Sequence, residues 1–309
     1  MTATAARAPR RSKDTLDRGL LRRSSNSFLK PRASIPLGVL MTILLLYCLL
    51  PIVWLVITST KTQSAILSSF GLWFSGDFAL WDNIVATVTY DNGIFLSWFG
   101  NTLLYVVAGA GGATVLATLA GYGLARFQFA GKRAVFAIVI GAIAIPGTAL
   151  AVPTFLMFSS LGLTNGPLAV IIPSAVSPFG LYLIWIYATD AIPAEVIEAA
   201  RVDGAGEFRI FFTIALRLLM PGFITVLLFN VVETWNNYFL PLIMLSDPTW
   251  YPLTVGLNLW STQANQPGGV AIYELIVTGS LLTIVPIIVI FLLMQRYWQS
   301  GLTAGSVKA

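Results

Sequence analysis

The sequence predicts an all-α membrane protein with six transmembrane helices. Of its 309 residues, 57% are hydrophobic and 10% are charged, whereas a soluble domain carries about 25% charged residues. The charged residues are clustered, and the uncharged stretches between them are long enough for helices of about 20 residues that cross a bilayer. So little polar surface cannot cover a water-soluble globule, and the excess apolar surface must therefore face lipid.

The uncharged stretches indicate where each transmembrane helix lies along the chain. The stretch between Arg133 and Asp190 is long enough for two helices, which the turn-forming residues 159–166 separate. The fifth helix tolerates one carboxylate, that of Glu233. Five prolines are expected to bend these helices: Pro146, Pro153, Pro173, Pro178 and Pro286. The predicted transmembrane domain is residues 35–296, with helices at residues 35–58, 97–124, 134–158, 167–187, 218–240 and 275–293.

The distribution of lysine and arginine predicts the orientation. Nine of the 18 basic residues lie in residues 1–34, and eight more fall in the loops or the tail on the same predicted side. Only Lys61 is assigned to the outer side. Because cytoplasmic loops are rich in lysine and arginine, both termini are expected in the cytoplasm. Residues 1–34 are expected to be a disordered basic tail that can contact membrane lipid, and residues 297–309 a second cytoplasmic tail.

The outer segment after the first helix is rich in aromatic residues. It carries Trp73, Trp81 and Trp98, which are suited to the boundary between membrane and water.

The composition excludes several chemistries. Histidine is absent and the one cysteine, Cys48, lies in an apolar run, so neither a disulfide framework, a zinc site nor a histidine-based triad is expected. No GxxxxGK[ST] sequence is present that could cradle a nucleotide. No metal site or bound cofactor is therefore expected on this chain. The net charge of +5 follows from membrane topology, and nucleic acid is not an expected partner.

The predicted loop between the fourth and fifth helices has a structure of its own. Pro193 suits the first turn of a helix, and Gly204 suits its end, where φ is positive. These signals predict a helix of about three turns at residues 193–203. A second helix follows, with Phe208 and other apolar residues at helical spacing. Two readings remain open: a knob that docks another protein, or an ordinary interfacial hairpin.

The spacing in this loop resembles the EAA loop of ATP-binding-cassette importer permeases. The pattern is Glu198-Ala199-Ala200, three residues, Gly204, nine residues, Ile214, one residue and Leu216. Four other segments resemble the carbohydrate-uptake branch of this family: Asn101-Thr102-Leu103, residues 120–127, Trp235-Asn236 and residues 301–305. The last of these, at the C-terminus, is similar to the motif of the smaller maltose-type permease subunit. One departure is Arg217, which stands where the family usually has proline and puts the break before the fifth helix in doubt.

The resemblance implies a type I importer permease fold with a coupling helix, in a bacterial inner membrane. It implies four kinds of partner: a second permease subunit, two ATPase subunits that hold ATP and Mg²⁺, an extracellular solute-binding protein and lipid. The chain itself would not be an enzyme. The implied ATPase-docking residues are Glu198, Ala199, Ala200, Asp203, Gly204, Ala205 and Phe208. The implied contacts of the C-terminal tail are Gly301, Leu302, Thr303 and Gly305.

A polar row in the fifth helix is a candidate cargo path. Asn230, Glu233 and Asn237 have helical spacing, with Trp235 and Asn236 beside them. Such groups could bind a hydroxyl-rich solute, or they could form hydrogen bonds between helices. Both readings stay open.

The expected cargo is a sugar or oligosaccharide moved by alternating access, with glycerol 3-phosphate as the alternative. No basic residue lies within the predicted helices, which favours a neutral solute. Outside this class, a secondary transporter would need an ionisable relay or an inverted repeat. A membrane enzyme would need an acid–base constellation. The sequence offers neither.

Overall fold

The computed structural model describes residues 34–304, and side chains are described up to residue 295. Residues 1–33 of the predicted tail at residues 1–34 lie outside the described residues, and so does Gly305. Every regular element within residues 34–304 is a helix. The chain divides into two compact units, residues 1–51 and 52–309. The described part of the first unit is the beginning of α2 (Ile35–Ser59), a 25-residue apolar helix that contains Pro51.

The second unit contains the end of α2, followed by a compact loop around the short helix α3 (Gln63–Ser68). Lys61 is buried there, and its Nζ donates to Ser69 Oγ at 2.9 Å and to the Phe70 carbonyl at 2.7 Å. The one basic residue on the predicted outer side thus has a structural role in closing this loop.

A long helical run follows the loop. It consists of α4 (Leu80–Tyr105), the π-helical segment η1 (Val106–Ala110) and α5 (Gly111–Arg126). Asp91, Asn92 and Gly93 adopt positive φ in succession and kink α4. The helical run therefore begins before the predicted second helix, at residues 97–124, because the polar residues that precede it are helical too.

The third predicted helix, at residues 134–158, is sharply bent near Pro146, one of the prolines expected to bend the helices. The structure has α6 (Lys132–Ala144) and α7 (Gly147–Ser160), which meet at 106°. Pro146 lies at the break, and the residue before it, Ile145, has the extended backbone that a following proline favours. The next predicted helix, at residues 167–187, is interrupted between α8 (Pro167–Ser174) and α9 (Pro178–Ala191).

The helices after the predicted cytoplasmic loop differ at their ends from the sequence prediction. The loop carries α10 (Ala194–Val202) and α11 (Glu207–Ile210), which continues through η2 (Phe211–Ala215) into α12 (Leu216–Trp235). The helix passes Arg217 without a break, so no proline-type interruption exists there. It ends at Trp235, whereas the sequence prediction extends to residue 240.

The remaining elements are short except for the last. They are α13 (Phe239–Met244), the 3₁₀ turn η3 (Pro248–Trp250), α14 (Leu253–Ala264) and α15 (Tyr273–Ala304). α15 continues past residue 293, so residues 297–304 of the predicted tail are helical. Within the described residues, five helices are long and apolar enough to cross a membrane, or six if α6 and α7 form one bent span.

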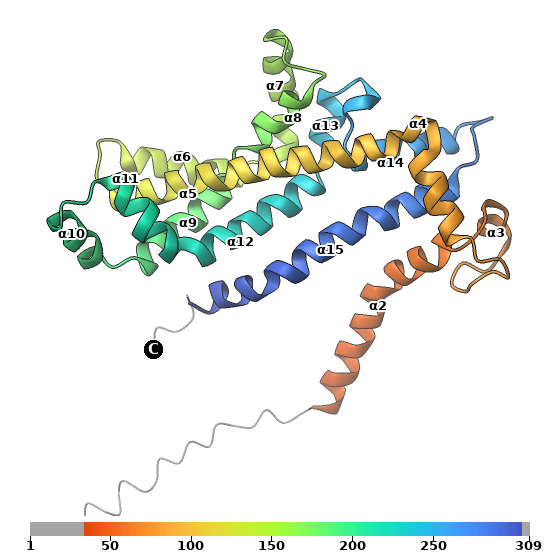
Figure 1. Cartoon of the computed structure of the whole chain (residues 1–309), viewed down its shortest axis with the longest axis horizontal. Helices are drawn as coiled ribbons and strands as arrows, with labels where there is room; N and C mark the ends of the chain where they lie inside the picture. Colours follow the sequence, from red (N-terminus) through yellow and green to blue (C-terminus); the bar gives the residue numbers. More distant parts are fainter. Residues whose placement is uncertain (1–33, 305–309) are drawn as a thin grey trace, which may run out of the picture. The chain divides into compact units, whose positions relative to one another are not determined.

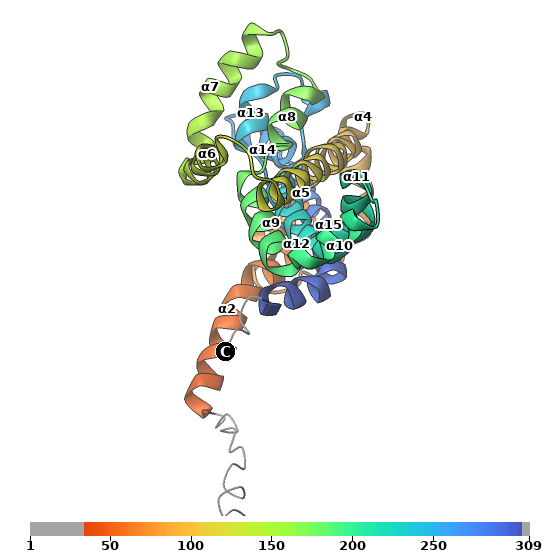
Figure 2. The ribbon, with the colours of Figure 1, turned by 90° about the vertical axis from the view of Figure 1, so that its left-hand side faces the viewer.

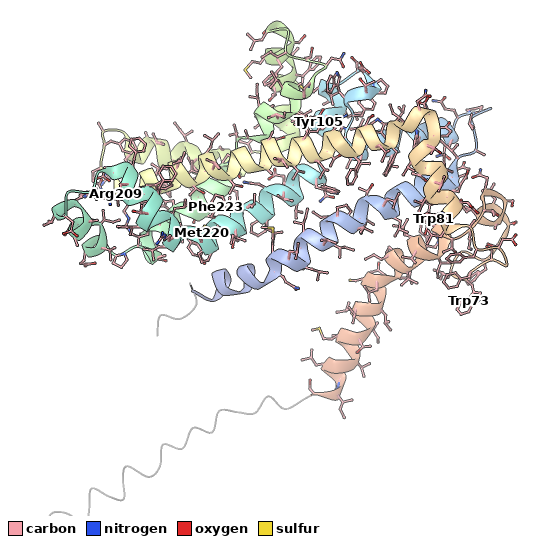
Figure 3. The ribbon with its side chains drawn as sticks, viewed as in Figure 1. Trp73, Trp81, Tyr105, Arg209, Met220 and Phe223 are labelled. Atoms are coloured by element: carbon pink, nitrogen blue, oxygen red, sulfur yellow. The ribbon has the colours of Figure 1, made fainter. Side chains whose placement is uncertain are left out.

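The helices α5, α9 and α12 pack closely against one another (Figures 1 and 2). Glycines permit this approach: a Cβ on Gly121 would lie 2.8 Å from the Ile184 Cβ, and one on Gly222 would lie 2.8 Å from the Tyr187 ring. Small residues have the same role in many membrane bundles. Arg209 lies at the end that carries α10, and Trp73 and Trp81 lie at the opposite end (Figure 3).

Candidate functional site

The loop between α9 and α12 folds as two helices around a tight turn. Pro193 precedes the first residue of α10, and Glu195 lies in its positively polarised first turn. Gly204 has φ of +79°, a conformation that costs an L-residue with a Cβ about 1–2 kcal/mol. The predicted helix at residues 193–203 and the positive φ at Gly204 are confirmed, within one residue at each end of the helix.

Hydrogen bonds and an ion pair fix this turn. The Ala205 amide donates to the Ala200 carbonyl at 3.0 Å, the long-range bond of a glycine-type helix end. Arg201 Nε donates to Glu207 Oε1 at 2.6 Å across the turn. The hydrogen bond to Glu207 raises the pKa of the Arg201 guanidinium above its ordinary value. The loop therefore holds its shape through its own contacts.

The base of the loop is rooted in the core of the bundle. Ile197 and Ile210 are buried in one cluster with residues of α5, α9 and α12. Ala200 belongs to the same cluster and is only 8% exposed. In this structure the small side chain of Ala200 packs inwards, and its contact with a partner stays a prediction. Arg126 supports the base by donating to the Ala188 carbonyl at 2.7 Å and to that of Ile192.

The outer surface of the loop is open. Glu198, Ala199, Asp203 and Gly204 are exposed, and Ala205 is half-buried. Two apolar side chains stand out on this surface: Phe208 is 85% exposed and Val202 is 88% exposed. The sequence reasoning included Phe208 but missed Val202, although its place next to Asp203 at the end of α10 could have indicated it.

The candidate cargo residues do not form one lining. Asn230 is only 4% exposed. Its amide donates to Thr114 Oγ1 at 3.0 Å, and its Oδ1 accepts from Ser177 Oγ at 2.8 Å. Asn230 thus ties α12 to α5 and to the start of α9, which supports the inter-helix reading. Glu233, one turn further, is exposed.

The outer end of this polar row also differs from the prediction. Trp235 is 2% exposed and packs edge-on against Phe99, so it belongs to the core. Because the helix ends at Trp235, Asn236 and Asn237 do not continue its face. Asn236 is exposed and donates to the Val232 carbonyl at 2.8 Å. Among the five candidate cargo residues, only Glu233 and Asn236 have side chains exposed on the surface of this chain.

Sequence reasoning missed a cluster on α4 that holds the loop at residues 248–251. Trp98 Nε1 donates to the Pro248 carbonyl at 2.8 Å, Asn101 Nδ2 to that of Thr249 at 2.7 Å, and the Tyr105 hydroxyl to that of Trp250 at 2.7 Å. Trp98 is therefore buried, contrary to its predicted place at the membrane boundary. The spacing 98, 101, 105 lies on one helix face and is the signal that could have revealed the cluster.

No group of three or more metal-binding side chains occurs among the described residues. The site therefore consists of a rigid protrusion with exposed apolar and acidic groups, mounted on a bundle of apolar helices. The class that the fold defines is a multi-pass membrane protein.

The comparisons with known proteins identify the family. The model of the binding-protein-dependent transport system inner membrane component matches residues 113–303. The chain is 31% identical to the arabinooligosaccharides transport system permease protein AraQ of Halalkalibacterium halodurans, over 84% of this chain and 90% of the relative. It is 33% identical to the AraQ of Bacillus subtilis, over 87% and 93%. The chain belongs to the family of binding-protein-dependent transport system inner membrane components.

A solved structure has the same fold. A bacterial ABC transporter involved in the import of the acidic polysaccharide alginate superposes with a TM-score of 0.76, at 21% identity, over 94% of this chain and all of that chain. The maltodextrin transport system permease protein MdxG of Bacillus subtilis is 30% identical, over 87% of this chain and 93% of the relative. The chain is thus a permease subunit of an ABC importer.

Proposed function

We propose that this permease moves a sugar or oligosaccharide into the cytoplasm and that the α10 loop couples it to a separate ATPase. The observation that carries the coupling is the loop itself, with Val202 and Phe208 exposed on a turn that a glycine and an ion pair hold rigid. Exposed apolar groups in a water-facing segment favour burial against a partner. The Glu198 carboxylate makes no hydrogen bond or ion pair with any described residue, so it is free to meet a cation on the ATPase.

The connection from the loop to the bundle suits the transmission of force. α11, η2 and α12 form one uninterrupted helical span of 29 residues, Glu207–Trp235. Its cytoplasmic end contains Phe208 on the proposed contact surface, and its middle packs against α5 and α9. A rigid element of this kind can tilt when ATPase subunits move, whereas a soft loop would absorb the motion.

The proposed subunit composition of the transporter is the one that membership of this family implies. The proposed partners are a second permease subunit, two ATPase subunits that bind ATP and Mg²⁺, and an extracellular solute-binding protein. The loop and both termini lie in the cytoplasm in this proposal, in agreement with the basic residues near the loop. The tail residues Gly301, Leu302, Thr303 and Gly305 contact the ATPase pair.

The transport systems to which related permeases belong support a sugar cargo. Relatives of this chain include permease proteins of transport systems for arabinooligosaccharides, lactose and maltodextrin. Glu233 and Asn236, which remain open, can bind sugar hydroxyls.

Charge reversal on α10 tests the docking. Glu198→Lys is expected to abolish sugar uptake and co-purification of the ATPase, while the permease still inserts in the membrane. Glu195→Lys is the matched control, because it makes the same charge change on the same exposed helix outside the proposed contact. Normal uptake by the Glu198 variant, or equal loss in both, would refute the specific contact.

Uptake by a deletion strain tests the cargo. Complemented cells are supplied with labelled arabino-oligosaccharide, lactose, maltodextrin or glycerol 3-phosphate. The expected result is uptake of at least one sugar that requires this chain. Uptake of glycerol 3-phosphate alone would replace the sugar proposal and leave the docking proposal intact.

A further inference from the structure

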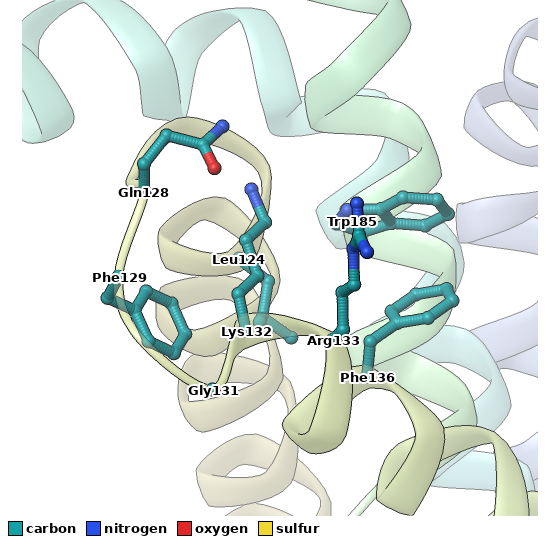
Figure 4. A pocket seen from close by; sticks show the side chains of 8 residues that line it. All are labelled: Leu124, Gln128, Phe129, Gly131, Lys132, Arg133, Phe136 and Trp185. Carbon is teal, nitrogen blue, oxygen red and sulfur yellow. The ribbon is translucent and has the colours of Figure 1, made fainter.

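A cavity of about 560 Å³ lies beside the loop that joins α5 to α6 (Figure 4). Its walls come from the end of α5, the α5–α6 loop itself, the beginning of α6 and the middle of α9. It is separate from the α10 surface and from Glu233, so neither the proposed docking nor the proposed cargo path uses it.

The cavity is positively charged. Lys132 and Arg133 line it, together with the amide of Gln128, and both cations extend to the same side from the start of α6 (Figure 4). Among the described residues that line the cavity, none carries a carboxylate. Lys132 Nζ donates to the Phe127 carbonyl at 3.1 Å, which leaves ammonium protons for a ligand. The structure gives Arg133 no ion pair with a described residue, in contrast to Arg201.

Aromatic rings form the apolar wall of the cavity. Phe136 and Trp185 line it, with ring centroids 4.5 Å apart. Tyr182 stacks on Trp185, with ring centroids 6.0 Å apart. Indole and phenol rings are enriched where lipid headgroups meet the acyl chains. A ligand in this cavity would therefore meet both cations and flat apolar surfaces.

The location of the cavity suits a membrane surface. Arg126, just before the α5–α6 loop, bonds to carbonyls at the end of α9, so the cavity lies at the end of the bundle that carries α10. α6 turns apolar directly after Arg133, and Val135 and Ile138 are exposed on it. The change from cations to exposed apolar residues within one turn marks the level of the headgroups.

We propose that this cavity binds the phosphodiester headgroup of an anionic phospholipid. Lys132 and Arg133 donate charge-assisted hydrogen bonds to the phosphate oxygens, Gln128 binds a headgroup hydroxyl, and the glycerol lies over Phe136 and Trp185. Basic pockets between helices on the cytoplasmic side are sites for such lipids. The bound lipid would brace the α5–α6 loop.

Native mass spectrometry of the assembled transporter, purified in detergent and stripped of lipid, tests this site. Phosphatidylglycerol and phosphatidylcholine with identical acyl chains are added in equal amounts. We expect retention of phosphatidylglycerol to exceed that of phosphatidylcholine about tenfold. Lys132→Gln with Arg133→Gln should remove this preference. Arg133→Gln alone should weaken it without the loss of any hydrogen bond to the chain.

Arg217→Gln is the matched control, because Arg217 is an exposed arginine at the start of α12 outside the cavity. It should keep the full preference. Equal retention of both lipids by the unaltered chain, or an unchanged preference in the double variant, would overturn the proposal. So would inorganic phosphate that displaces phosphatidylglycerol at equimolar concentration, since the site would then bind a free anion and not a lipid.

Discussion

The turn after α10 and the polar end of α12 differ in what determines their structure. At the turn, the backbone conformation of Gly204 and the contacts within the loop set the geometry. At the end of α12, residues far apart in sequence decide it, because Asn230 bonds to Thr114 and Ser177. Short-range chemistry therefore governs the proposed docking surface, whereas tertiary packing governs the bundle.

The largest expected effect comes from the packed bundle. In Gly121→Ala, the added methyl group would lie 2.8 Å from the Ile184 Cβ and from the Leu181 carbonyl, closer than van der Waals contact. Overpacking of this kind costs about 1–3 kcal/mol. The measurement is the free energy of unfolding in detergent.

Gly123→Ala is its control, on the same helix with nothing within 4 Å of the added Cβ. It should be neutral or stabilising, since alanine favours a helix over glycine by about 1 kcal/mol. If both variants were equally stable, packing between α5 and α9 would not be as close as the structure has it.

The next largest effect is expected at Gly204, where backbone conformation and not steric overlap would make a side chain unfavourable. A Cβ at Gly204 meets nothing within 4 Å, yet φ is +79°. Gly204→Ala should cost about 1–2 kcal/mol of local stability, seen as faster hydrogen exchange in α10. Gly206→Ala, at φ of −73° and also in open space, should leave exchange unchanged. Equal exchange in the two variants would contradict the conformational argument.

The same distinction explains what could be predicted from the sequence. The α10 helix and its turn were predictable, because Pro193 and Gly204 act locally. The inward packing of Ala200 was not, because the sequence does not show which face of α10 meets the bundle. The break in the predicted third helix had a local signal in Pro146, but a proline alone does not specify an angle of 106°. The roles of Asn230 and Trp235 required the positions of other helices.

A smaller effect is expected at Asn230. Hydrogen bonds between helices in membranes contribute about 0.6 kcal/mol each on average, so Asn230→Leu should lose about 1 kcal/mol of stability through its two bonds. Glu233→Gln, one turn away and exposed, should leave stability unchanged and raise the KM of uptake if it contacts cargo. A change in KM with full stability in the Asn230 variant would reverse these assignments.

The smallest effect is a pH dependence at the loop of residues 248–251, which hydrogen bonds from α4 hold in place. The Thr249 amide and hydroxyl both donate to Asp247 Oδ1, at 2.9 and 2.8 Å, and these bonds lower the pKa of Asp247 below its ordinary value of 3.8. A lowered pKa in the fold means that the carboxylate stabilises the loop fully above pH 3.8 and loses this contribution as pH falls through the folded-state pKa. Hydrogen exchange at the Thr249 amide, corrected for its intrinsic rate, should therefore accelerate only in acid. Asp247→Asn keeps an acceptor oxygen without the titration, so its exchange should not depend on pH in this way; the same acid response in this variant would assign the effect to another group.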